Sequence, residues 1–88
     1  MMYEISKEAF KQRVENPLNF AFVNTSESIE GIESTEISSL KKDQNILIFS
    51  LDCQNREPSK LANKLESEGF EFVYFYEGSV EDKAFVLK

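Results

Sequence analysis

Three stretches of the chain have the pattern of buried β-strands. They are residues 20–23, 45–50 and 70–76, with the sequences FAFV, NILIFS and FEFVYFY. The first two are almost continuously apolar, as strands covered on both faces are. The third is rich in aromatic residues, which favour a pleated sheet. The pattern therefore predicts three strands.

A first helix is predicted over residues 7–15. Ser6 suits the N-cap position, and Phe10 and Val14 are four residues apart, so they fall on one face of the helix. The residue before Pro17 is pushed out of the helical region of backbone space, so the NPLN sequence ends the helix.

A second and clearer helix is predicted over residues 58–68. Pro58 suits the first helical position, where its missing N–H has no helical partner to lose. Gly69 suits the position just past the end, where a left-handed conformation is common. The apolar stripe that faces the core consists of Leu61, Ala62 and Leu65. After the third strand, a turn and at most a short final helix are predicted.

The segment 24–40 has a different composition. It holds four Glu, no basic residue and many Ser and Thr. Three isoleucines, Ile29, Ile32 and Ile37, are expected to anchor it. We predict a surface loop with one short helical turn. Two interpretations of its charge remain open, a solvated loop and a docking surface for a basic partner.

The order strand–helix–strand with short connections indicates a βαβ unit with parallel strands. The sequence thus predicts one domain over residues 1–88, a small three-layer α/β/α domain with a mostly parallel central sheet. Ligand sites in such sheets lie beyond the carboxyl ends of the strands. The loop 50–57, which holds the only cysteine, is therefore the candidate site.

The amino-acid composition argues against several kinds of partner and site. The net charge of −6 argues against nucleic acid and anionic membranes as partners, because both are negatively charged. The chain has no His and a single Cys, so we expect no metal site, no cofactor and no internal disulfide. A free thiol, and a start without the apolar core of a secretory signal, predict a cytoplasmic protein.

The arrangement of motifs resembles a rhodanese-like domain over nearly the whole chain. The specific part is ILIFS followed by KLANKLESEGFEFVYFYEGSV, which is similar to the strand, helix, Gly-Phe, strand and Gly-Gly turn around the family's active loop. The weaker part is residues 5–40. There the family's Asp-Val-Arg is replaced by Asn24, Thr25 and Ser26. The stretch GIESTEISSL resembles a second family motif, with its His, Pro and Ala lost.

The resemblance implies a chemistry. Active members carry a cysteine at the end of the strand, in a loop Cys-x-x-Gly-x-Arg whose backbone N–H groups surround the sulfur. That cysteine takes a sulfane sulfur as a persulfide, often from thiosulfate, and passes it to an acceptor. Here Cys53 would be the nucleophile, and the anion-binding loop would comprise Ser50, Leu51, Asp52, Gln54, Asn55 and Arg56.

The chain departs from the family at this loop. Counted from the strand, Ser50 stands where the nucleophile should be. Counted back from Gly69, Asp52 stands there, and neither count reaches Cys53. The loop glycine is also absent, which makes a nest of N–H groups harder to form. The loop therefore resembles an active-site loop whose sequence has diverged from the family's motif.

A second likeness involves the spacing Ser-x5-Arg from Ser50 to Arg56. Phosphatases of the cell-cycle dual-specificity type, on the same fold, use Cys-x5-Arg. Ser takes the place of the Cys, and the sequence shows no His or Lys that would act as its general base. Ser50 is therefore not expected to act as a nucleophile. A phosphatase-like anion binder is the third hypothesis.

Two hypotheses for function come first. In one, the domain has weak or no sulfurtransferase activity and acts as a binding or regulatory module for a protein partner. In the other, it is a divergent sulfurtransferase or sulfur carrier that forms a persulfide on Cys53, with thiosulfate or another small sulfur donor. Asp52 and Glu57 count against the second, since acidic neighbours repel thiosulfate. Arg56 is expected either to clamp an anion or to pair with Asp52 or Glu57. The sequence leaves the oligomeric state open.

Overall fold

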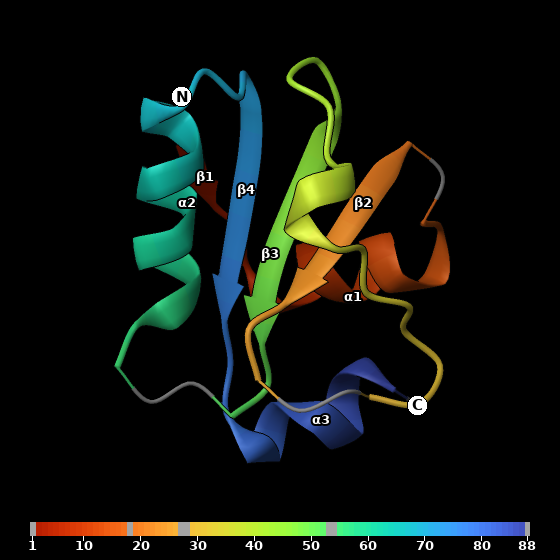
Figure 1. Ribbon diagram of the computed structural model, residues 1–88. Coiled ribbons are helices and arrows are strands. Elements are labelled where there is room, and N and C mark those ends of the chain that lie inside the picture. The colour runs from red at the N-terminus through yellow and green to blue at the C-terminus, as the bar shows by residue number, and fades with distance from the viewer. Residues whose placement is uncertain (1, 18, 27–28, 53–54, 88) are drawn as a thin grey trace.

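The computed structural model describes residues 2–17, 19–26, 29–52 and 55–87. These residues form a four-stranded sheet flanked by helices (Figure 1). The elements in chain order are β1 (Met2–Glu4), α1 (Lys7–Glu15), β2 (Phe20–Asn24), the 3-10 turn η1 (Ile37–Ser39), β3 (Asn45–Ser50), α2 (Glu57–Ser67), β4 (Phe72–Glu77) and α3 (Val80–Val86).

The sheet has the strand order β1-β4-β3-β2, and every neighbouring pair is parallel. The predicted parallel sheet is thus confirmed. β3 and β4 are the central strands, and the α2 segment connects them as the βαβ pattern requires. The sequence analysis missed β1, because three residues that are partly exposed carry too little pattern to mark a strand.

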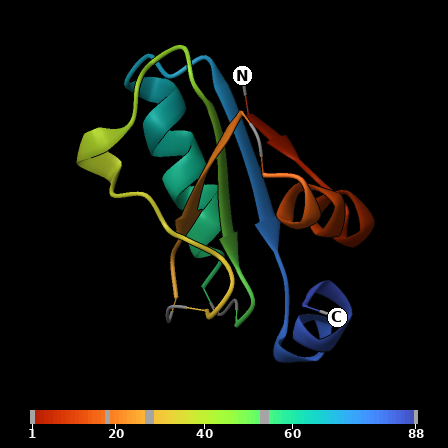
Figure 2. The same ribbon diagram turned by 90° about the vertical axis from the view of Figure 1, so that its right-hand side faces the viewer.

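Alternating residues of the central strands face two different layers. Ile46 and Ile48 of β3 pack with Leu65 of α2, whereas Leu47 and Phe49 pack on the other face with Phe10 of α1. Val86 of α3 joins this second cluster. Figure 2 shows α2 on one side of the sheet and α1 with α3 on the other. The three-layer α/β/α architecture is therefore confirmed.

Both predicted helix caps are present. The Ser6 side chain accepts a hydrogen bond from the Ala9 backbone N–H (3.1 Å), and α1 has the predicted bounds. Gly69 follows α2 with a φ of 97°. Its N–H donates to the Glu66 carbonyl, and the Phe70 N–H donates to the Leu65 carbonyl. These two bonds form a Schellman motif, which satisfies the last carbonyls of the helix.

The Schellman motif also explains why β4 starts later than predicted. Phe70 turns back and its side chain is buried in the cluster with Leu65. Glu71 donates its backbone N–H to the Lys42 carbonyl. Regular pairing with β3 therefore begins only at Phe72 and extends to Glu77. At the other end of α2, the helix begins at Glu57, one residue before the predicted Pro58.

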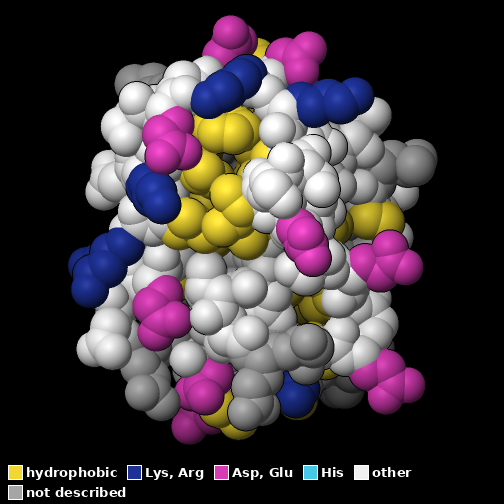
Figure 3. Space-filling model, viewed as in Figure 1, with side chains coloured by type: hydrophobic (Ala, Val, Ile, Leu, Met, Phe, Trp, Pro, Cys, Tyr) yellow, Lys and Arg dark blue, Asp and Glu magenta, His cyan; other side chains and the backbone are white. Residues whose placement is uncertain are grey.

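The segment between β2 and β3 is a surface loop with one 3-10 turn, as predicted. Ile29 and Ile32 are buried and form an antiparallel bridge with each other. The third expected anchor is wrong, because Ile37 is 45% exposed. η1 lifts Ile37 away from the sheet, and Leu40 packs against the α2-side cluster instead. Figure 3 shows hydrophobic side chains between α2 and this segment, with charges of both signs around them.

The short helix α3 is held to the rest of the domain by the buried Val86 and by several polar contacts. The Tyr76 hydroxyl donates to Asp82 Oδ2 (3.0 Å), and the Ser79 backbone N–H donates to the same oxygen (3.1 Å). Lys11 Nζ donates to the Phe85 carbonyl (2.9 Å). The hydrogen bond from the Ser79 backbone, helped by the Tyr76 hydroxyl and the Lys7 charge, holds the pKa of Asp82 below its ordinary value of 3.8. The Asp82 carboxylate is thus stabilised in its charged form.

This contact predicts a pH dependence of stability. The pKa of Asp82 is lower in the folded protein than in the unfolded chain. The Asp82 carboxylate therefore makes its full contribution to the free energy of unfolding above 3.8, its pKa in the unfolded chain. It is lost as the pH falls through the folded value. Urea unfolding between about pH 6 and about pH 3 should show Asp82→Asn less stable than the native protein at the upper end, with the difference shrinking below the unfolded value. A constant difference across the range would contradict this assignment.

Candidate functional site

The candidate site lies where β2, β3 and β4 end. Their arrowheads point to the same end of the molecule, where the loops after β2 and β3 and the helix α3 gather (Figure 1). The Gly78 N–H donates to the Ser50 carbonyl (2.8 Å), and the Thr25 N–H donates to the Phe49 carbonyl (3.0 Å). Backbone hydrogen bonds thus connect the three strand ends.

The candidate loop starts with two buried residues. Ser50 is 1% exposed, and its Oγ accepts a hydrogen bond from the Asp52 backbone N–H (3.1 Å). The Leu51 side chain is buried in the cluster around Phe10, so only its backbone could meet an anion. Asp52 is exposed. The Ser50 hydroxyl therefore has a structural role in the turn that leaves β3.

The middle of the loop carries the predicted nucleophile. Cys53 and Gln54 lie outside the described residues, so the predicted roles of these two side chains remain predictions. Asn55, the next described residue, is exposed.

Arg56 ends the loop in an unusual conformation. Its φ of 55° and ψ of 39° are left-handed, which few non-glycine residues adopt. Its carbonyl accepts hydrogen bonds from the Ser59 hydroxyl and the Lys60 N–H, both at 3.1 Å. The chain therefore turns into α2 through a left-handed residue that is not glycine, and its carbonyl is satisfied by the first turn of the helix.

Glu77, at the end of β4, occupies the N-terminus of α2. Its Oε2 accepts a hydrogen bond from the Ser59 backbone N–H (3.2 Å), and its Oε1 lies 3.3 Å from Arg56 Nη2. The Glu77 side chain is only 11% exposed, while that of Arg56 is 72% exposed. A carboxylate suits this place because the first N–H groups of a helix lack helical partners and carry partial positive charge.

This contact shows Arg56 in an ion pair, while its other expected role, clamping an anion, remains a prediction. Its partner is Glu77, and not Asp52 or Glu57 as the sequence suggested. The sequence analysis missed Glu77 altogether. Its position at the end of a predicted strand could have revealed it. Neighbouring parallel strands end at the same edge of a sheet, so the last residue of the strand beside β3 lies close to the candidate loop.

The segment after β2 forms another wall at this end of the sheet. Asn24 Oδ1 accepts hydrogen bonds from the Ser26 N–H (2.9 Å) and the Ser26 hydroxyl (3.0 Å). Asn24 therefore caps its own turn, as Asn and Ser side chains commonly do. These hydrogen bonds between Asn24 and Ser26 hold the start of the loop after β2 in shape.

The electrostatics of the described residues disfavour an incoming anion. Asp52, Glu57 and Glu77 all lie in or beside the loop, and the charge of Arg56 is already balanced by Glu77. An anion such as thiosulfate would have to displace an internal carboxylate from the helix N-terminus and overcome its neighbours. The described part of the chain also contains no group of three or more His, Cys, Asp or Glu placed to hold a metal ion.

Comparison with known proteins supports the fold and leaves the activity open. No protein-family model matches the chain, and no curated protein matches it. The crystal structure of the Alr3790 protein from Anabaena is similar, with a TM-score of 0.68 and 23% sequence identity over 90% of this chain and 73% of that one. At this identity the likeness shows the fold alone. No helix among the described residues has the length and apolar character needed to cross a membrane.

Proposed function

We propose that this chain is a rhodanese-like domain that has lost efficient sulfur transfer and acts by binding a protein partner. The observation that carries the proposal is the Glu77 carboxylate at the N-terminus of α2, paired with Arg56. In an active member of the family the loop and the helix start would hold a persulfide or an anionic donor. Here an internal carboxylate takes the N–H group and the cation that such an anion would need.

Two further features of the chain support this proposal. The loop lacks the family's glycine, and Ser50 stands at the strand end where the family has its cysteine. The buried Ser50 hydroxyl accepts from the Asp52 N–H, so that N–H group is not free for an anion. A single free thiol fits a reducing compartment, and we propose the cytoplasm.

The alternative is a sulfurtransferase or sulfur carrier that forms a persulfide on Cys53 with thiosulfate or a similar donor. One observation favours it. The Arg56 side chain is 72% exposed, so its guanidinium has room to turn from Glu77 toward another anion. Glu77 would then have to leave the start of α2 in each catalytic cycle, or the donor would have to bind elsewhere in the loop.

Replacing Glu77 with Gln tests whether the Glu77 carboxylate blocks an anion site at the N-terminus of α2. The neutral amide keeps the shape of the side chain but removes its charge, so Arg56 loses its internal counter-ion and becomes available to sulfate beside the N-terminus of α2. At sulfate ten times above its dissociation constant, the variant should gain about 1.4 kcal/mol of stability relative to chloride at equal ionic strength. The native protein should show only the general salting effect.

Glu81→Gln serves as the control, because it makes the same charge change on exposed α3. If sulfate stabilised the native protein and both variants equally, Glu77 would not block an anion site. The proposal would then lose its main support.

A further inference from the structure

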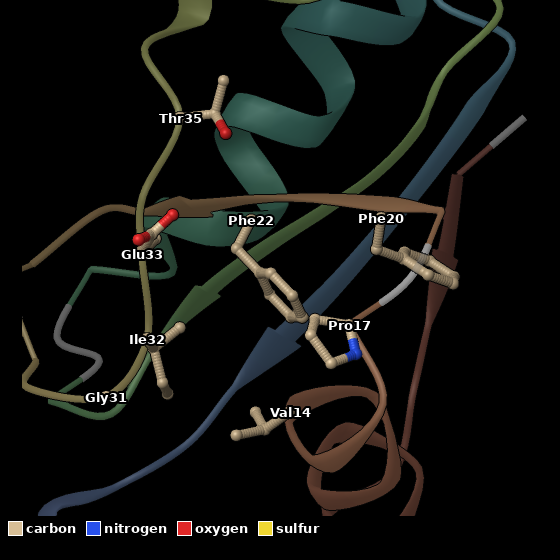
Figure 4. Close-up of a pocket in the computed structure, with 8 residues that line it drawn as sticks. All are labelled: Val14, Pro17, Phe20, Phe22, Gly31, Ile32, Glu33 and Thr35. Atoms are coloured by element: carbon tan, nitrogen blue, oxygen red, sulfur yellow. The ribbon is translucent and has the colours of Figure 1, made fainter.

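A pocket lies at the edge of the sheet, away from the loop after β3. Its volume is about 350 Å³. It lies between the end of α1, the strand β2 and the segment that runs beside β2 (Figure 4). The residues that line it are Val14, Pro17, Phe20, Phe22, Gly31, Ile32, Glu33 and Thr35.

Five of the eight residues that line this pocket are apolar, and its surface is polar and apolar in about equal parts. Phe20 and Phe22 lie on the face of β2 toward α1, and the Phe22 ring points toward Pro17 and Val14 (Figure 4). Phe22 and Ile32 are nearly buried, with 6% and 9% exposure, while Phe20 and Val14 are half-buried. A hollow of this size suits one bulky side chain whose apolar part contacts the Phe20, Phe22 and Ile32 side chains and whose polar end lies toward Glu33.

The outer wall is fixed to the edge of β2. The Thr35 N–H donates to the Phe22 carbonyl (2.7 Å), and the Asn24 N–H donates to Ser34 Oγ (3.1 Å). The bridge between Ile29 and Ile32 holds the start of the same segment. The pocket is therefore formed before any partner arrives, which reduces the entropy lost on binding.

The charge at the rim is negative. Glu33 lines the pocket, is exposed and makes no ion pair within the described part of the chain. Glu30 and Glu36 are exposed on the same segment, which has no basic residue between positions 24 and 40. The exposed Arg13 of α1 lies with its guanidinium 4.9 Å from the centroid of the Phe20 ring, so this ring already attracts a cation.

A second hollow adjoins the first. It has a volume of about 440 Å³, and Val23 and Ile37 line it together with Thr35 and Glu36. Thr35 belongs to both hollows. Val23 and Phe22 are successive strand residues and so face opposite sides of the sheet. An extended peptide of a partner that crosses over Thr35 could place one side chain in each hollow. One of these side chains would lie near Glu33 and the other near Glu36.

We propose that this edge binds an extended segment of a partner protein that carries Lys or Arg beside bulky apolar residues. An apolar side chain enters the pocket between Phe20, Phe22 and Ile32, and the neighbouring cation pairs with Glu33. The two adjoining hollows and the row of carboxylates fit a peptide chain better than a single small amine. This inference rests on the proposed binding role and names the chemistry of the partner.

A capped tetrapeptide of alternating phenylalanine and arginine is the probe, titrated into the ¹⁵N-labelled protein. Amide signals of Gly31, Thr35 and Phe22 should shift together. Glu33→Gln should weaken binding about 1.5- to fivefold, the range for one exposed ion pair. Glu81→Gln, with the same change of net charge on α3, should bind as tightly as the native protein.

Three results would overturn the inference. One is equal weakening by Glu33→Gln and Glu81→Gln, which would indicate attraction to the overall charge. Another is equal binding of a control tetrapeptide with glutamate in place of arginine. The third is the absence of shifts at millimolar peptide. Sulfur transfer is measured in a separate experiment. A titration without binding would therefore exclude this surface as a peptide site, but it would not be evidence that the loop after β3 is catalytically active.

Discussion

Phe10→Ala is expected to cost about 3–5 kcal/mol of unfolding free energy, the range for truncating a buried phenylalanine. Phe10 is 0% exposed and joins α1 to the sheet. Its ring lies 5.0 Å from that of Phe49 and stacks on that of Tyr76 at 4.7 Å, with an interplanar angle of 13°. The substitution removes the ring on which the central strands β3 and β4 both pack in this layer.

The loss should bring the domain close to unfolding, because small domains are stable by only about 5–15 kcal/mol. Urea denaturation followed by circular dichroism measures it, with Phe72→Ala as the matched control. Phe72 is 42% exposed on β4, so its truncation should cost far less. Similar losses in both variants would mean that the layer between α1 and the sheet does not carry the stability assigned to it.

Gly78→Ala is expected to destabilise the protein by about 1–3 kcal/mol through overpacking. A Cβ at this position would lie 2.6 Å from Tyr76 Cε2 and 2.9 Å from its hydroxyl oxygen. The ring cannot move freely, because it stacks on Phe10 and its hydroxyl donates to Asp82. The turn cannot move freely either, since the Gly78 N–H donates to the Ser50 carbonyl.

A double-mutant cycle with Tyr76→Leu isolates this clash. The added methyl group should cost clearly less when the aromatic ring is absent, which would appear as a coupling energy between the two positions. Chemical denaturation of the four proteins measures it. An equal cost of Gly78→Ala in both backgrounds would place its effect in the backbone and not in the contact with Tyr76.

The elements with strong local signals were predictable from the sequence. The strand at 45–50 and the helix at 7–15 have their predicted bounds, because continuous apolar character and a Ser6 cap are local properties. The end of α2 at Ser67, one residue before the predicted end, follows from Gly69, which can take the left-handed conformation just past the helix. β1 and the exposure of Ile37 were not predictable, since both depend on contacts made far along the chain.

The candidate site was predictable in place but not in its contacts. The rule for parallel sheets put the loop 50–57 at the carboxyl edge of the strands, where the structure has it. The pairing of Arg56 with Glu77 depends on the register of β3 and β4, which puts Ser50 beside Glu77. Glu57 is closer in sequence to Arg56, so reasoning from sequence distance chose the wrong carboxylate.

The central claim is that the loop after β3 does not perform sulfur transfer, because a carboxylate occupies the start of α2. Thiosulfate-to-cyanide sulfur transfer tests it most directly, with the native protein and Cys53→Ser compared at equal concentration. We expect no turnover above background in either protein. Turnover by the native protein that vanishes in Cys53→Ser would contradict the claim and make Cys53 the nucleophile of a working sulfurtransferase.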